Sequence, residues 1–338
     1  MKILHIANFG FNKHGAHFYC TDRKISAGLI ENGHFVYDFS FRDMARMGTI
    51  FKTKKLGASW ANKEVLKIVD NLEPDLVLIG HSDLMSPNVL KEIKQHYPKT
   101  KIAFWYVDWL CEEPKSHFIY DFLPFSDAIF CTTGGELLEQ YKMNNNKVAY
   151  IPNMVNKAVE SLRQFEKENF SNELVFLGTI EKNSMREKFI IEVAQSLQQQ
   201  MKCFGTFENN SVYGAEYIKV LSESRMGLNY SRRNDMELYS SDRIAQLTGN
   251  GLLTFCPQIP NFNLLYNEDE VVYFNSPQDL VEKFKVYSHD AELLKSVAKK
   301  GWDKTHQSYN CKRVTKFMLE TIYGEPYSEE YEWMNYVY

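Results

Sequence analysis

Short apolar runs alternate with stretches of helical periodicity along almost the whole chain, and the alternation occurs twice. In the first half, these runs lie at residues 2–7, 35–41, 75–80, 101–107, 127–131 and 148–151. After a polar stretch they resume at residues 174–178, 202–205, 226–229, 252–255 and 271–274. Strands that are separated by helices form parallel sheets with crossover helices. The sequence therefore predicts an α/β protein with two successive doubly wound, Rossmann-like domains.

The predicted domain boundaries follow the restart of this pattern. We expect a first domain at residues 1–155, a second at 156–304, and a helical tail at 305–338 that crosses back to the first domain. A length of 338 residues suits two domains of roughly 150 residues each. Because doubly wound sheets bind ligands at the carboxyl ends of their strands, we expect the domains to face each other across a substrate cleft.

Composition argues against several classes of function. The chain has 39 Lys and Arg against 43 Asp and Glu, and this weak net charge of −4 argues against nucleic-acid binding. No segment reaches the roughly 18 apolar residues of a membrane-spanning helix. The six cysteines are scattered singly, without a CxxC pair or metal-ligand spacing. We therefore expect reduced thiols in a cytoplasmic protein and no metal site.

The motifs of common nucleotide-binding enzymes are missing. The loop after the first predicted strand, residues 8–16, is not GxGxxG, and GxxxxGK[ST] occurs nowhere in the chain. A nicotinamide or flavin dehydrogenase and a P-loop nucleotidase are therefore disfavoured, and no cofactor is expected.

The most informative segment is residues 239–254. Ser240 or Ser241 is predicted to cap a short helix that ends at Gly249, and a buried strand follows. The unpaired N–H groups of such a helix start favour phosphate. Arg243 and Gln246 are spaced to share one helix face, so that one neutralises phosphate while the other bonds the ribose hydroxyls. A capped helix whose Arg and Gln pair locally fits these residues equally well.

This segment resembles the donor-binding segment of the glycosyl transferases group 1 superfamily, especially its CgeB-like branch. In that branch Arg-x-x-Glu precedes a glycine and a strand. Here Arg243 and Gln246 stand at the Arg and Glu positions, and Gly251 lies five positions beyond Gln246. Residues 174–179, followed by Lys182 and Arg186, are similar to the strand and basic loop that open the family's second domain. Similar segments at residues 125–132, 151–153 and 301–316 extend the resemblance to nearly the whole chain.

The resemblance implies a GT-B fold and a glycosyltransferase that moves a sugar from a nucleotide-sugar donor to an acceptor glycan or lipid-linked saccharide. Protein cations, and no metal, would offset the charge of the departing nucleoside diphosphate. Gln246 accepts a hydrogen bond less strongly than the usual Glu, which puts donor affinity in question. The implied donor contacts are Lys182, Arg186, Ser240, Ser241, Arg243 and Gln246.

Two other functions stay open on the same architecture. One is a nucleotide-sugar epimerase, which needs carboxylates around the sugar ring and no acceptor. The other is a non-catalytic module that binds a carbohydrate or a partner, which Gln246 in place of Glu favours.

Further polar residues follow predicted strands. Arg232 and Arg233 come after residues 226–229, where Arg233 either reaches a phosphate or pairs with a nearby acid in a solvated loop. In the first domain, Asp108 is a candidate base for the acceptor hydroxyl, or a turn cap. His81 is a candidate contact to the transferred sugar or its leaving phosphate, or a structural histidine. These residues leave retaining and inverting chemistry open.

The segment 42–60 is strongly basic. Its single acid is Asp43, and apolar residues such as Phe51 and Trp60 are interspersed. This pattern suits a peripheral contact with an anionic membrane at the inner face, or a phosphorylated acceptor, and a solvated loop is the alternative. The cations are Arg42, Arg46, Lys52, Lys54 and Lys55.

Overall fold

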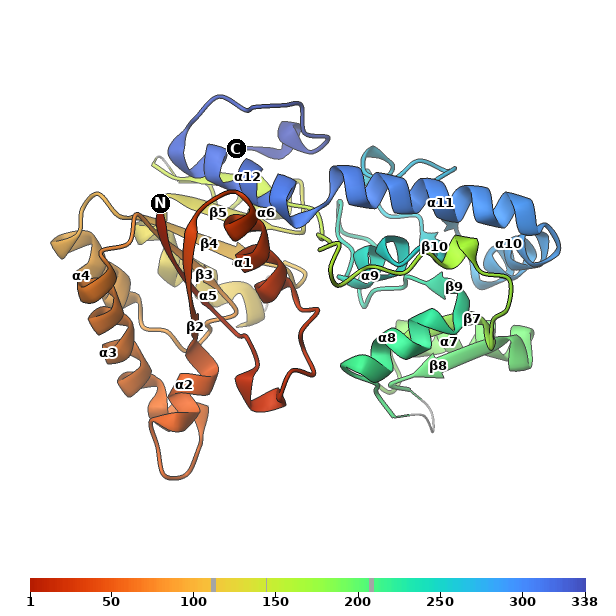
Figure 1. Cartoon of the computed structure of the whole chain (residues 1–338), viewed down its shortest axis with the longest axis horizontal. Coiled ribbons are helices and arrows are strands. Elements are labelled where there is room, and N and C mark those ends of the chain that lie inside the picture. The colour runs from red at the N-terminus through yellow and green to blue at the C-terminus, as the bar shows by residue number, and fades with distance from the viewer. Residues whose placement is uncertain (111–113, 144, 207–209) are drawn as a thin grey trace. The chain divides into compact units, whose positions relative to one another are not determined.

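The chain forms two compact units in the computed structural model, which describes residues 1–110, 114–143, 145–206 and 210–338, without the side chains of 114–117. The first unit contains Met1–Pro152 together with Cys311–Tyr338, and the second is Asn153–Asn310. Figure 1 colours the chain from red to blue, so the first unit combines the red to yellow part with the blue C-terminal segment.

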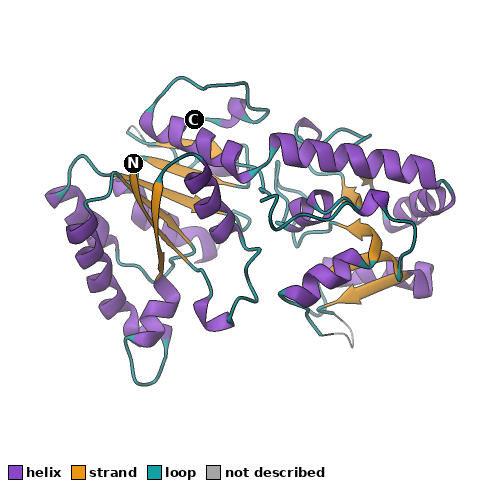
Figure 2. Ribbon diagram, in the orientation of Figure 1, coloured by secondary structure: helices purple, strands orange, loops and turns teal. Residues whose placement is uncertain are grey.

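The first unit is built on a parallel sheet in the order β2-β1-β3-β4-β5-β6 (Figure 2). Most positions of these strands are buried, as in a sheet that is covered on both faces. The strands are β1 (Lys2–Ala7), β2 (Phe35–Ser40), β3 (Leu76–Gly80), β4 (Lys101–Tyr106), β5 (Ala128–Cys131) and β6 (Lys147–Tyr150). The helices between them are α1 (Thr21–Glu31), α2 (Phe41–Met47), α3 (Lys54–Leu72), α4 (Pro87–His96), α5 (Pro114–Phe122) and α6 (Glu136–Glu139).

The second unit repeats this architecture with a parallel sheet in the order β11-β10-β9-β7-β8. Its core forms where apolar residues of the sheet, such as Phe176 and Leu228, meet Ile190 of a crossover helix. The strands are β7 (Asn172–Leu177), β8 (Met201–Phe204), β9 (Ser224–Leu228), β10 (Leu253–Pro257) and β11 (Val272–Phe274). The helices are α7 (Met185–Leu197), α8 (Ala215–Ser222), α9 (Arg243–Gly249), α10 (Pro277–His289) and α11 (Ala291–Ser308).

The C-terminal tail completes the first unit. Helix α12 (Cys311–Tyr323) packs against α1, where a Cβ atom on Gly28 would lie 2.2 Å from the carbonyl oxygen of Cys311. The backbone N–H of Tyr338 donates to the Val148 carbonyl oxygen at 2.8 Å, which ties the end of the chain to β6. The unit that begins with β1 therefore ends with the last residue of the sequence.

The fold class is confirmed, with a parallel sheet at each predicted strand series and a helical C-terminal region. Among the described residues, no helix combines the length and the apolar character that crossing a membrane requires.

Candidate active site

Two arginines lie side by side at the carboxyl edge of the second sheet. Arg186 sits in the first turn of α7, whose N-cap Ser184 accepts a hydrogen bond from the Glu187 N–H, and Arg243 begins α9. Both guanidinium carbons lie 5.0 Å from the centroid of the Phe176 ring in β7. Cations over one aromatic face are attracted by the ring, so Phe176 supports both of them. We call Arg186 and Arg243 the arginine pair.

Gly178, directly after β7, has no side chain, and this leaves space for the two guanidinium groups of the arginine pair. A Cβ atom on Gly178 would lie 2.4 Å from Nη2 of Arg186 and 2.6 Å from Nη2 of Arg243. Any larger residue would push the two groups out of this position. The sequence places Gly178 at the end of a predicted strand but gives no sign of this role.

Neither arginine of the pair forms an ion pair with a carboxylate within residues 1–110, 114–143, 145–206 and 210–338. Arg243 is held by oxygens instead: its Nε donates to the Leu177 carbonyl at 2.6 Å, and its Nη1 donates to the Ser241 hydroxyl at 3.1 Å. Nε and Nη2 of Arg186 are buried, and no described residue accepts a hydrogen bond from either. Burial, and then the charges of Arg243 and Arg232, lower the pKa of Arg186 to about 9. An anion bound here would pair with the two guanidinium charges and accept hydrogen bonds from Nε or Nη2 of Arg186.

The other predicted donor contacts differ in their surroundings. Lys182 is exposed in the turn between β7 and α7. Arg233 forms a two-point ion pair with Asp235 at 2.8 and 2.7 Å, the alternative that the sequence had left open. The side-chain oxygen of Gln246 accepts a hydrogen bond from the Tyr217 hydroxyl, and its side-chain nitrogen donates to Asp242 at 2.7 Å. Gln246 thus bonds within the protein at both ends of its amide.

The predicted serine cap of α9 is wrong. The helix begins one position later, with Asp242 as the N-cap and no side-chain cap bond. The reason is that both hydroxyls accept hydrogen bonds elsewhere: Ser240 from Asn229 at 2.9 Å, and Ser241 from Arg243. Ser240 is fully buried, so of the two serines Ser241 is the one on the accessible side of the helix start.

A cavity of about 520 Å³ is lined by Tyr230, whose carbonyl accepts from Nη1 of Arg243 at 3.3 Å, but not by the arginine pair itself. Phe189 and Tyr230 line it with stacked rings whose centroids are 4.0 Å apart. Arg232 and Arg233 line it as well, paired with Glu181 at 3.3 Å and with Asp235. Among the described residues, no cluster of three or more His, Cys, Asp or Glu side chains could hold a metal ion.

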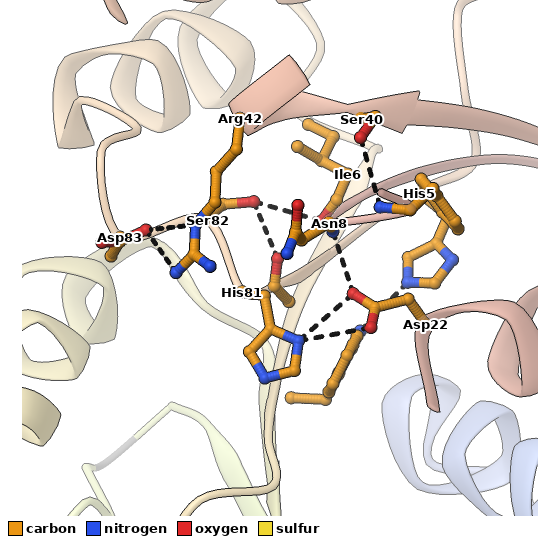
Figure 3. A network of polar contacts seen from close by, with 12 residues as sticks. His5, Ile6, Asn8, Asp22, Ser40, Arg42, His81, Ser82 and Asp83 are labelled. Atoms are coloured by element: carbon orange, nitrogen blue, oxygen red, sulfur yellow. Dashed lines mark hydrogen bonds and ion pairs between the residues drawn. The ribbon is translucent and has the colours of Figure 1, made fainter. Parts of the chain in front are cut away.

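A polar network occupies the carboxyl edge of the first sheet (Figure 3). His81 follows β3 in a left-handed conformation, with φ of 40°, and its Nδ1 lies 3.2 Å from Oδ1 of Asp22. Asp22 is buried in the first turn of α1 and also accepts from the Asn8 N–H at 2.9 Å. Nδ1 faces a carboxylate and therefore carries the proton, which leaves Nε2 on the far side of the ring.

The neighbouring carboxylates favour the protonated form of His81. Burial alone would lower the pKa of His81, but the carboxylate of Asp22, and then that of Asp108, raise it above its ordinary value. Burial would likewise raise the pKa of Asp22, but the His81 charge and hydrogen bonds lower it. Asp108 is exposed just beyond β4 and acts on His81 from the neighbouring strand. The structure thus brings His81 and Asp108 to one sheet edge and adds Asp22, 59 positions from His81.

A second histidine lies behind this network as a neutral group. The Trp105 indole donates to Nε2 of His5 at 3.1 Å, so Nδ1 carries the hydrogen and donates to the Ser26 hydroxyl at 2.8 Å. Burial lowers the pKa of His5 to about 4. Ser26 in turn donates to Asp38 at 2.6 Å. His5 is therefore a structural hydrogen-bonding residue beneath the exposed edge.

We expect Asp22→Asn to destabilise the protein most between about pH 4 and 6.5. The folded pKa of His81 is raised, so the pair's contribution is full below about pH 6.5 and is lost as the pH rises through the folded pKa. The folded pKa of Asp22 is lowered, so its contribution is lost only as the pH falls below about 4. Urea unfolding should show a loss of about 1.5 to 3 kcal/mol at about pH 5.5 and a smaller loss at about pH 8.5.

The matched control for this pH dependence is Asp83→Asn. Asp83 pairs with Arg42 at 2.7 Å on the same edge, in an ion pair that contains no histidine. Its effect on the free energy of unfolding should be equal at both pH values. An equally pH-independent effect of Asp22→Asn would contradict the charged pair.

Part of the chain also matches a family model. Residues 186–320 match the family model described as Glycosyl transferase-like. This range begins at Arg186 and contains Arg243. A comparison with curated protein sequences gave no match.

Solved structures share the fold at low sequence identity. Sucrose-phosphate synthase from Thermosynechococcus elongatus has a TM-score of 0.62 at 10% identity, over 96% of this chain and 98% of that one. Anabaena HepE, solved with UDP-glucose, has a TM-score of 0.59 at 10% identity, over 96% and 100%. The β-glucosyltransferase of phage T4 has a TM-score of 0.54 at 13% identity, over 95% and 99%. At these identities the structural similarity establishes only the fold. Membership of the CgeB-like branch stays a prediction. The family match over residues 186–320 supports the prediction of a glycosyltransferase, and the solved structures confirm the predicted GT-B fold.

Proposed function

We propose that this glycosyltransferase takes its sugar from a nucleotide-sugar donor, passes it to a hydroxyl of a glycan or lipid-linked saccharide, and needs no metal ion or other cofactor. The observation that carries the proposal is the arginine pair: two buried guanidiniums at a sheet edge, without a carboxylate partner among the described residues. Burying unpaired charge is costly, so such an arrangement favours a site that an anion completes.

The reaction explains why cations are needed there. The bond between the anomeric carbon of the sugar and the terminal phosphate oxygen breaks, and negative charge gathers on the nucleoside diphosphate. Guanidinium groups bind phosphate oxygens at two points and stabilise the charge as it develops. We assign the diphosphate to Arg186 and Arg243, with the Ser241 hydroxyl and the exposed Lys182 as further contacts. In this assignment Gln246 does not contact the donor itself, because both ends of its side-chain amide are hydrogen-bonded to Tyr217 and Asp242.

We assign the acceptor side to Asp108 and His81. The exposed carboxylate of Asp108 can take the proton of the attacking hydroxyl. Protonated His81 can donate from Nε2 to a sugar hydroxyl or a phosphate oxygen, since Asp22 holds Nδ1. These roles make Asp22 a positioning residue for His81.

Titration calorimetry with nucleoside diphosphates tests the donor site. UDP is the first probe, because HepE was solved with UDP and with UDP-glucose. We expect binding to the wild type and at least about tenfold weaker binding to Arg243→Ala, which loses a charge-assisted contact. Arg225→Ala is the matched control, because Arg225 lies at the opposite end of β9 and pairs with Glu173 at 3.1 Å. Failure of every nucleoside diphosphate to bind would overturn the proposal.

Product analysis separates this proposal from its alternatives. A transferase releases nucleoside diphosphate and forms a new glycoside only when an acceptor is present. An epimerase would convert the nucleotide sugar when it is incubated alone. A non-catalytic module would bind without any turnover, and a survey of acceptors with Asp108→Asn as a negative control distinguishes it from an enzyme.

A further inference from the structure

The turn between α2 and α3 exposes large apolar side chains to an unusual degree. Ile50 is 95% exposed, Phe51 78% and Met47 73%. Of the large apolar side chains in the described ranges, these three are among the four most exposed. Leu56, at the start of α3, is 66% exposed. We call Met47, Ile50, Phe51 and Leu56 the apolar tip; scattered apolar residues are normal on a protein surface, but such a cluster marks an interaction site.

Close backbone packing holds the tip in place. A Cβ atom on Gly57 would lie 1.6 Å from the Ala45 carbonyl oxygen, so the backbones of α2 and α3 are in direct contact. The ring of Trp60 lies against Gly48, where a Cβ atom would be 2.6 Å away. Figure 1 shows the turn extending away from the sheet of the first unit. The segment 42–60 is therefore two helices joined by a turn and not the solvated loop that was the alternative.

Positive charge surrounds the tip. Arg46 precedes it, and Lys52, Lys54 and Lys55 follow Phe51. Arg46 pairs with Asp43 at 3.1 Å, and Lys54 approaches Asp83 at 3.8 Å. Lys52 and Lys55 are exposed, and neither has an ion pair with a described residue. Asp43, the single acid of residues 42–60, is buried, so the surface around the tip is cationic.

We infer that the apolar tip docks on an anionic lipid bilayer, with Met47, Ile50 and Phe51 entering the boundary between headgroups and acyl chains and Lys52 and Lys55 contacting anionic headgroups. Exposed apolar side chains next to unpaired lysines complement this surface in both polarity and charge. A protein partner would need a matching apolar pocket, whereas a bilayer accepts any apolar shape. The inference goes beyond the proposed sugar transfer and does not depend on it.

Vesicle sedimentation tests the docking with the full chain. We expect the wild type to sediment with vesicles that contain about a quarter phosphatidylglycerol in phosphatidylcholine, and much less with pure phosphatidylcholine. Ile50→Ser with Phe51→Ser should weaken binding at least about tenfold, because the inserting groups are lost. Lys52→Gln with Lys55→Gln should weaken it about tenfold and flatten its salt dependence.

The matched control is Met185→Ser. Met185 is 76% exposed in the second unit, outside this basic cluster, so its substitution should leave vesicle binding unchanged. All of these positions are highly exposed, and the variants should therefore fold as the wild type does. Equal binding of the Ile50/Phe51 variant and the wild type would overturn insertion. Absence of vesicle binding by the wild type would overturn the docking as a whole. A dimer that forms in sedimentation velocity and is lost in the Ile50/Phe51 variant would overturn it as well.

Discussion

Replacing Arg186 with methionine is expected to stabilise the unliganded protein and, at the same time, to remove most of its activity. The Arg186 guanidinium is buried beside Arg243, and its Nε and Nη2 have no acceptor among the described residues. Methionine has a similar length and no charge, so the cost of burying a cation disappears, although the contact with Phe176 is lost as well. We expect the free energy of unfolding to rise by about 1 to 3 kcal/mol.

The same substitution should lower kcat/KM by about 100- to 1,000-fold, because a preorganised charge at the leaving group is lost. Arg225→Met is the matched control: it removes an arginine whose partner Glu173 then stays unpaired. This control should destabilise the protein and leave turnover unchanged. Urea unfolding without ligand and a nucleotide-release assay measure the two effects. If Arg186→Met instead lowered stability and left turnover intact, Arg186 would be a structural residue.

The second large effect is expected where α12 meets α1. A Cβ atom on Gly28 would lie 2.2 Å from the Cys311 carbonyl oxygen and 2.6 Å from the Thr315 hydroxyl. The Asn32 amide donates to the Lys312 carbonyl at 2.8 Å one turn later, so the two helices are fixed at this distance. Gly28→Val therefore cannot be accommodated while α12 stays in place, and we expect a loss of about 3 kcal/mol or more.

Hydrogen exchange measures where this loss falls. Gly28→Val should remove protection from α1 and α12 and leave it intact in β7, β9 and β10, because only the first unit loses a contact. Ala27→Val is the control, since it adds the same β-branched group at a neighbouring position of α1 that is partly exposed. Equal exchange in the two variants would show that the Gly28 contact is dispensable.

Helices and strands could be predicted wherever the local sequence pattern determines them. Strands such as β3 and β4 are continuous apolar runs because both faces of the sheets are covered. Arg243 was found because it opens a short helix that a buried strand follows. No bounds were predicted for helix α1, since its apolar residues are interrupted by buried polar ones such as Asp22 and Lys24.

Residues whose role depends on distant partners could not be found in this way. Asp22 is important because it contacts His81, and Gly178 because it leaves space for two guanidinium groups from different helices. The side chain of Gln246 binds Tyr217 of α8, a helix for which the sequence pattern gave no bounds. In each case local sequence specifies the element, but only the packing of elements supplies the partner.

The first unit is interrupted in sequence, and this imposes an order on its synthesis. The second unit is continuous, so it can fold as soon as Asn310 has left the ribosome. The first unit, although its sheet is translated earlier, must wait with the Gly28 face of α1 uncovered until α12 emerges after the second unit. A chain whose translation stops before α12 is made should therefore contain a later-made unit that is complete and an earlier-made unit that is open to chaperones and proteases.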